Sequence, residues 1–152
     1  MIRDHRLQED LLEKLKKTTK DNLDEREILY NQFREELVKH ISIEEKIFYP
    51  RLKNIPKIEA KVLEALEEHK LCVQLIQEMD CRNVDDKLWV AKLAVLKDLT
   101  AHHVHEEEDD LFPMVAELKS EDYLQKMGIE MKDEKKTTDT DEVVFEMNRP
   151  EK

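Results

Sequence analysis

Apolar residues recur every three or four positions through most of the chain, which is the spacing that places side chains on one face of an α-helix. The pattern predicts four long helices: residues 2–18, about 22–50, 56–79, and a fourth that begins near residue 85 and runs toward Pro113. The apolar side chains expected to face the core are Ile2, Leu11, Leu12 and Leu15; Ile28, Leu29, Phe33, Leu37, Ile41 and Phe48; Val62, Leu63, Leu66, Leu71, Leu75, Ile76 and Met79; and Leu88, Trp89, Leu93, Leu96 and Leu99.

Cap and turn residues mark the ends of these helices. Asp21 or Asn22 suits the N-cap of the second helix, and Pro56 suits the first turn of the third. Pro50 and Pro113 are each expected to kink or end a helix, because proline lacks the N–H of one backbone hydrogen bond.

The C-terminal residues are more polar. Residues 120–127 predict a short helix, with Gly128 as its natural stop. Residues 129–152 are predicted to be a flexible polar tail, with residues 143–145 as a candidate docking point. Four amphipathic helices joined by short links predict an all-α, antiparallel, up-down-up-down four-helix bundle in residues 1–128.

Composition narrows the class of protein. The 152 residues suit one domain, and a single glycine with four prolines argues against an all-β fold, which needs frequent turn residues. The formal net charge of −11 argues against a nucleic-acid partner and an anionic membrane surface, since both attract basic proteins. With no long apolar run and no leader segment, the chain is expected to be cytoplasmic. Cys72 and Cys81 are nine residues apart, so on one helix they would lie roughly 13 Å apart, too far for a disulfide. They are therefore expected to be reduced thiols.

A short motif occurs twice. Residues 39–52, KHISIEEKIFYPRL, return in altered form as residues 102–115, HHVHEEEDDLFPMV. In both copies a histidine is followed four residues later by a glutamate, and then by an apolar residue, an aromatic residue and a proline. The match extends one helix upstream, where residues 4–15 resemble residues 68–79. The chain therefore contains a duplicated helical hairpin.

Each half of this repeat carries two histidines and one glutamate at matching places. A histidine and a glutamate four residues apart lie on one helix face, with Cβ atoms about 5–6 Å apart, so both side chains can aim at one point. Two imidazoles and a carboxylate are the ligand set of a non-haem Fe(II) centre with open positions. The predicted ligands are His5, His40, Glu44, His69, His103 and Glu107. Two metal ions roughly 3.5–4 Å apart are expected in the core, with Glu44 and Glu107 bridging them.

At these residues the chain resembles the hemerythrin-like, or HHE cation-binding, family. The resemblance covers about residues 2–118 and follows the order H…HxxxE…H…HxxxE. It implies an antiparallel four-helix bundle with two iron ions, Fe²⁺ or Fe³⁺, joined by an oxo or hydroxo bridge, which meets O₂, H₂O₂ or NO. Zinc and manganese are possible substitutes for iron.

The chain departs from the oxygen-carrying branch of that family. Carriers have a further histidine where this chain has Val73, and an aspartate at the spacing that Glu108 occupies. These departures favour redox chemistry on O₂, H₂O₂ or NO, such as catalase-like turnover, over reversible oxygen carriage. The alternatives are an iron or oxygen sensor or iron-handling protein without turnover, a zinc or manganese hydrolase, and a metal-free structural bundle.

Further polar and aromatic residues lie close to the predicted ligands in the sequence. Glu9 is a candidate seventh ligand or gate, although a solvated helix face explains it better, and Cys72 is expected in the core. The remaining histidines, His102 and His105, are expected at the surface or rim, with His102 as a fallback ligand. Three glutamates are expected to be solvated: Glu45, Glu106 and Glu108. As an alternative, one of them could accept a hydrogen bond from a ligating imidazole. Three aromatic residues are candidates for packing beside the site: Tyr30, Tyr49 and Trp89.

Overall fold

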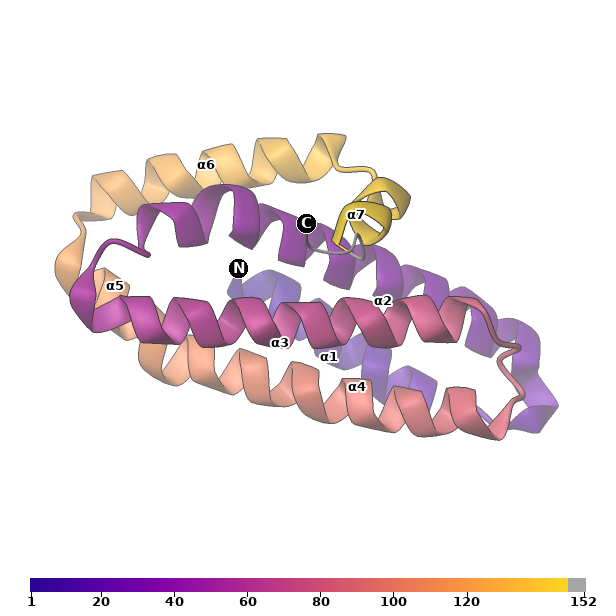
Figure 1. The fold of residues 1–152 in the computed structure, drawn as a ribbon. Coiled ribbons are helices and arrows are strands. Elements are labelled where there is room, and N and C mark those ends of the chain that lie inside the picture. The colour runs from indigo at the N-terminus through magenta and orange to yellow at the C-terminus, as the bar shows by residue number, and fades with distance from the viewer. Residues whose placement is uncertain (148–152) are drawn as a thin grey trace.

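The computed structural model describes residues 1–147, and every regular element in that range is helical (Figure 1). The long helices are α1 (Ile2–Lys16), α2 (Leu23–Ile43), α3 (Pro56–Asp80) and α4 (Lys87–Glu106). The shorter elements are η1 (Lys20–Asn22), η2 (Glu44–Phe48), η3 (Tyr49–Arg51), η4 (Glu107–Leu111), α5 (Phe112–Leu118), α6 (Glu121–Thr137) and α7 (Thr140–Met147).

The four long helices form a closed bundle. Within each hairpin, α1 packs along α2 and α3 packs along α4, while α1 also touches α4 and α2 touches α3. This arrangement confirms the predicted all-α helical bundle. The links between helices are short, as the sequence predicts, so consecutive helices run in opposite directions.

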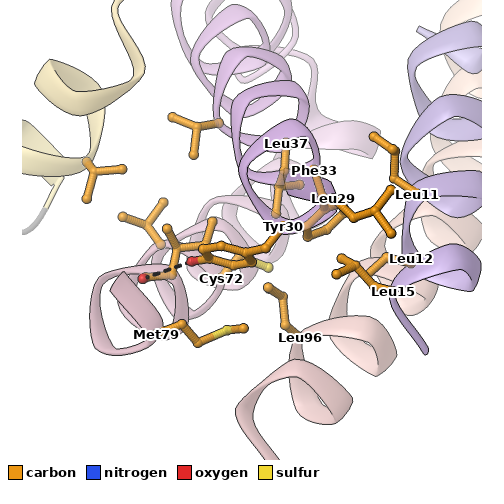
Figure 2. Packing of buried hydrophobic residues seen from close by; sticks show 14 of the residues in the cluster. Leu11, Leu12, Leu15, Leu29, Tyr30, Phe33, Leu37, Cys72, Met79 and Leu96 are labelled. Carbon is orange, nitrogen blue, oxygen red and sulfur yellow. Dashed lines mark hydrogen bonds between the residues drawn. The ribbon is translucent and has the colours of Figure 1, made fainter. Parts of the chain in front are cut away.

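Buried apolar side chains fill the bundle in two clusters. The first contains Leu11, Leu12 and Leu15 of α1, which face Leu29, Phe33 and Leu37 of α2, with Leu96 of α4 beneath them (Figure 2). The second lies at the other end of the bundle and includes Phe48, Tyr49, Ile58, Leu111 and Met127. Between these clusters along the helices lie the predicted metal ligands, so the polar groups form a layer inside an otherwise apolar core.

Five residues of the predicted apolar stripes are exposed instead: Ile2, Ile28, Leu63, Leu71 and Leu88. The last four each stand next to a buried residue in the sequence, as Ile28 precedes Leu29 and Leu88 precedes Trp89. Neighbouring residues on a helix point about 100° apart, and in each of these four pairs one residue faces the core while the other points away from it. Spacing alone did not show which of the two would be buried.

Both prolines change the helix at the place expected. Ahead of each lies one π-helical turn, η2 before Pro50 and η4 before Pro113. The wider turn moves the backbone hydrogen bonds to i→i−5, as in the bond from the N–H of Tyr49 to the carbonyl of Glu44. After Pro50 the helix ends at Arg51, whereas after Pro113 it continues as α5. Each π-helical turn begins at the glutamate of the duplicated motif.

The expected stop at Gly128 is wrong, because α6 continues through it to Thr137. Ser120 caps α6 by accepting a hydrogen bond from the N–H of Tyr123. The helix packs along α2 and η2, and α7 packs on α2 and α3, so residues 129–147 of the predicted flexible tail lie on the bundle in helical form. Residues 148–152 of that tail lie outside the described residues. No helix within residues 1–147 is both long and apolar enough to span a membrane.

Candidate metal centre

The six predicted ligands come together in the middle of the bundle, and all six are buried. One histidine comes from each long helix, and the two glutamates are the first residues of the π-helical turns. In chain order they are His5 on α1, His40 on α2, Glu44 on η2, His69 on α3, His103 on α4 and Glu107 on η4. We call this set the histidine–glutamate cluster.

The cluster divides into two groups that can each hold one cation. In one group are His5, His40 and Glu107; in the other are Glu44, His69 and His103; the donor atoms within each group lie within 4.8 Å of one another. The histidine Nε2 atoms are 3.2 Å apart in the pair His5–His40 and 3.2 Å apart in the pair His69–His103. Each group therefore takes both histidines from one half of the repeat and its carboxylate from the other half.

The two glutamates lie between the histidine pairs. Oε1 of Glu44 is 2.8 Å from Nε2 of His40 and 3.5 Å from Nε2 of both His69 and His103. Oε1 of Glu107 is 3.2 Å from Nε2 of both His5 and His103. Each carboxylate thus reaches across both pairs, which is the placement that two bridging carboxylates require.

Every histidine of the cluster donates a hydrogen bond from the N–H at Nδ1 to a carboxylate. In α1 and α2, Nδ1 of His5 lies 2.9 Å from Glu108, and Nδ1 of His40 lies 3.1 Å from Asp4. These contacts place the N–H at Nδ1 and leave the Nε2 lone pair facing the centre. Such partners orient the ring and make it a better metal ligand.

The second half repeats these contacts. Nδ1 of His69 lies 2.8 Å from Glu45, and Nδ1 of His103 lies 3.5 Å from Glu68. The partners follow the duplication as well, since each is the residue just before the first histidine or just after the glutamate of a half. Two of the three glutamates expected to be solvated, Glu45 and Glu108, hold imidazoles instead. The acidic residue next to the first histidine and next to the glutamate of each half was the sequence signal for these contacts.

Several buried polar atoms of the cluster lack a hydrogen-bond donor. They are both carboxylate oxygens of Glu44 and Oε1 of Glu107. With the Nδ1 atoms committed to carboxylates, four Nε2 lone pairs also converge on the same space. Burying such acceptors against one another is costly unless a cation satisfies them. The donor set therefore fits two divalent cations.

The electrostatics of the metal-free cluster reflect this crowding. Burial by itself would lower the pKa of His40, but the charge of Glu44 and the hydrogen bond to Asp4 raise it well above its ordinary value. Burial likewise opposes protonation of His103, whose contacts with Glu107, Glu44 and Glu68 nevertheless raise its pKa. Burial raises the pKa of Glu44, but the charge of His40 and the contacts with Glu107 and His103 together lower it well below its ordinary value. The nearby carboxylates therefore outweigh the effect of burial at these two imidazoles.

Aromatic rings wall the cluster on the side of the second apolar cluster. Tyr49 donates its hydroxyl to Oε2 of Glu107 at 3.0 Å, and its ring lies 5.4 Å from that of His69. Phe112 stacks on His5 with ring centroids 5.9 Å apart. Of the three aromatic residues expected beside the site, only Tyr49 touches the cluster. Tyr30 and Trp89 pack against each other in the first apolar cluster.

The remaining candidates lie elsewhere. Glu9 is partly exposed and pairs with Arg6, so it is not part of the cluster. His102 and His105 are exposed, as expected. Cys72 is a core residue, and burial raises the pKa of its thiol to about 11. Cys72 and Cys81 are both free thiols.

Comparison with known proteins decides the family. A model of the hemerythrin HHE cation binding domain matches residues 1–115. The chain belongs to the hemerythrin HHE family. Among solved structures, the crystal structure of a hemerythrin HHE cation binding domain-containing protein from Mycobacterium kansasii is similar, with 22% identity, a TM-score of 0.74, and coverage of 95% of this chain and 94% of that one. No significant match was found among curated proteins. The family is one of cation binding, and the histidine–glutamate cluster is the place where this chain can hold metal.

Proposed function

We propose that this HHE-domain protein holds two iron ions in the histidine–glutamate cluster and uses them in redox chemistry on O₂, H₂O₂ or NO. The observation that supports it most directly is the crossed arrangement of the carboxylates. Glu44 and Glu107 each reach toward both histidine pairs, so their place is between two ions. His5 and His40 would be the terminal ligands of one ion, and His69 and His103 those of the other.

The donor set is consistent with iron. Two imidazoles and a carboxylate per ion leave coordination positions open, as in non-haem Fe(II) proteins that bind oxidants. An iron pair supplies electrons to a small oxidant and takes them back. In catalase-like disproportionation, two H₂O₂ molecules give O₂ and two H₂O, so no further electron donor is required.

The protein's own residues would prepare this chemistry. The carboxylates on Nδ1 fix the four imidazoles with Nε2 toward the centre. Tyr49 donates to Oε2 of Glu107 and so holds that carboxylate in place. The aromatic wall and the two apolar clusters limit the entry of water. The buried setting strengthens every electrostatic contact within the cluster.

A sensor of iron or oxygen is the second candidate, and the origin of the ligands supports it. All four long helices contribute a histidine, so two metal ions bound here would together link the whole bundle. Metal binding to a site that is absent from the unfolded chain adds to folding stability. Loading would then change the stability of the bundle without any turnover.

Metal analysis after anaerobic loading with Fe²⁺ tests the proposal, and two ions per chain are expected. Exposure to air or H₂O₂ should then produce the near-ultraviolet absorption of a coupled ferric pair. Sustained O₂ release from H₂O₂ would support the enzyme. A large rise in melting temperature on loading, without turnover, would support the sensor. A chain that binds no iron would contradict both.

A further inference from the structure

A second group of possible metal ligands lies outside the cluster, on the exposed side of α3 and α4. Glu64, Glu68 and His102 offer ligand atoms that lie within 4.8 Å of one another. Nε2 of His102 is 3.5 Å from Oε2 of Glu68. We call these three residues the outer triad.

The outer triad and the buried cluster share Glu68. One oxygen of Glu68 faces His102, and the other lies 3.5 Å from Nδ1 of His103. A single carboxylate therefore contacts a surface histidine on one side and a buried predicted ligand on the other. A cation held by the outer triad would lie within one side chain of the centre.

A narrow cavity is lined by residues of both places, although His102 is not among them. Its walls include Glu64 and Glu68 of the outer triad, and also His103 and Glu107 of the buried cluster. Its volume is ≈ 10 Å³, about the space of one water molecule. Glu107 is almost fully buried, and its Oε1 has no hydrogen-bond donor. A cation that moved inward from the outer triad would therefore meet a buried carboxylate with one unsatisfied oxygen.

The other half of the repeat does not reproduce this opening. Asp4 occupies the place of Glu68, but Lys135 of α6 covers it with an ion pair of 3.0 Å. The residues matching His102 and Glu106 are Lys39 and Ile43, one a cation and the other buried and apolar. The duplication thus keeps the inner ligands and changes the outer ones. On the α3–α4 side Glu68 faces an exposed histidine, whereas on the α1–α2 side Lys135 covers Asp4.

We propose that the outer triad is the entry site at which a divalent cation binds before it passes along the narrow cavity to the buried cluster. This inference rests on the proposed metal function and names the route by which the centre is filled. Carboxylates at the mouth of a cleft raise the local concentration of cations and so the rate of capture. Lys61, which also lines the cavity and pairs with Glu106 and Asp110, opposes that attraction.

The test compares loading rates of two matched double variants of the full chain. Glu64→Gln with His102→Gln removes two members of the outer triad. Glu67→Gln with His105→Gln removes the same residue types from exposed positions on the same helices. Each metal-free protein is mixed with Co²⁺, and the appearance of its visible absorption at the centre is followed by stopped flow. Metal content at equilibrium is measured in parallel.

The outer-triad variant should load at least about tenfold more slowly than the wild type at low Co²⁺, with the same final metal content. The control variant should load at the wild-type rate. Lys61→Gln should load faster, because it removes the opposing charge. Equal rates in the two double variants would overturn the entry site while leaving the metal centre intact. A wild type that takes up no metal at equilibrium would overturn the proposed function itself, and with it the entry site.

Discussion

The two halves of this bundle are alike inside and different outside. In each half, two histidines turn Nε2 inward and a glutamate reaches across to the histidines of both halves. The carboxylates that hold the imidazoles are duplicated too, as Asp4 corresponds to Glu68 and Glu45 to Glu108. The surfaces differ, because α6 brings Lys135 onto Asp4, whereas Glu68 keeps an exposed histidine beside it. The inner groups thus form two matching sets that could each hold a cation, and the outer ones distinguish an open side from a closed side.

The largest expected effect tests the equivalence of the halves. Glu44→Gln and Glu107→Gln each replace a carboxylate that contacts both histidine pairs with a neutral amide. If each carboxylate serves both ions, as proposed, either variant should bind one ion or none in place of two. Metal analysis after dialysis measures this, with exposed Glu117→Gln as the control. Two ions retained in either variant would show that its carboxylate does not bridge.

The second largest effect is expected from replacing the carboxylates that accept hydrogen bonds from Nδ1. Glu45→Ala and Glu108→Ala each release one imidazole, from His69 and His5 respectively. Loss of such a partner typically lowers metal affinity about 10–100-fold. We expect similar losses in both variants and none in Glu9→Ala, measured by competition with a coloured chelator. A loss in Glu9→Ala as large as in the other two would place that residue nearer the centre than its pairing with Arg6 does.

The halves should respond alike to pH. Carboxylate contacts raise the pKa of His40 and His103 above the ordinary value of 6.5 against the effect of burial. Protonated imidazoles therefore stabilise the metal-free fold fully below that value, and the contribution is lost as pH rises through the raised pKa. Metal needs neutral imidazoles, so apparent affinity should rise about tenfold per pH unit for each proton displaced.

Melting of the metal-free and loaded protein between pH 6 and pH 9, followed by circular dichroism, measures this pH dependence. The gap between the two melting temperatures should widen as pH rises. If the difference between the two melting temperatures narrows as pH rises, metal binding does not displace protons from the imidazoles.

The smallest expected effect concerns the closed side. Lys135 pairs with Asp4 at 3.0 Å and with Glu36 at 2.8 Å from a partly buried position. Lys135→Gln should lower the free energy of unfolding by about 1 kcal/mol. His102→Gln on the open side should change it by less than about 0.5 kcal/mol. Urea unfolding of both metal-free variants checks the difference, and equal losses would mean that α6 does not stabilise the closed side through this contact.

Much of the centre could be predicted from the sequence because its geometry is local. A histidine and a glutamate four residues apart share a helix face whatever the rest of the chain does, as His40 and Glu44 do. The duplication then located the other four residues of the cluster. The carboxylates that accept from Nδ1 could also have been predicted, because Asp4 and Glu68 each precede a histidine of the repeat. They were not, because acidic residues are so frequent in this chain that a solvated position was the simpler expectation for any one of them.

The C-terminal residues show where that reasoning failed. Low apolar content predicted a flexible tail, yet α6 packs on α2 and η2, its Met127 and Met131 belong to the second apolar cluster, and Lys135 reaches Asp4. Gly128 predicted a helix stop, but a Cβ there would meet nothing within 4 Å, and the helix continues. A few well-placed contacts outweighed composition, which counts residues without regard to where they face.

The sequence by itself determined the helical class, the doubled motif and the six side chains that can grip cations, because helical periodicity turns spacing into direction. Only the tertiary structure decided that each histidine pair meets the carboxylate of the opposite half, and that one side of the centre is covered by Lys135 while the other opens at His102. The physical reason is that these contacts join residues far apart in the chain. Their distances follow from how whole helices pack, which no local pattern specifies.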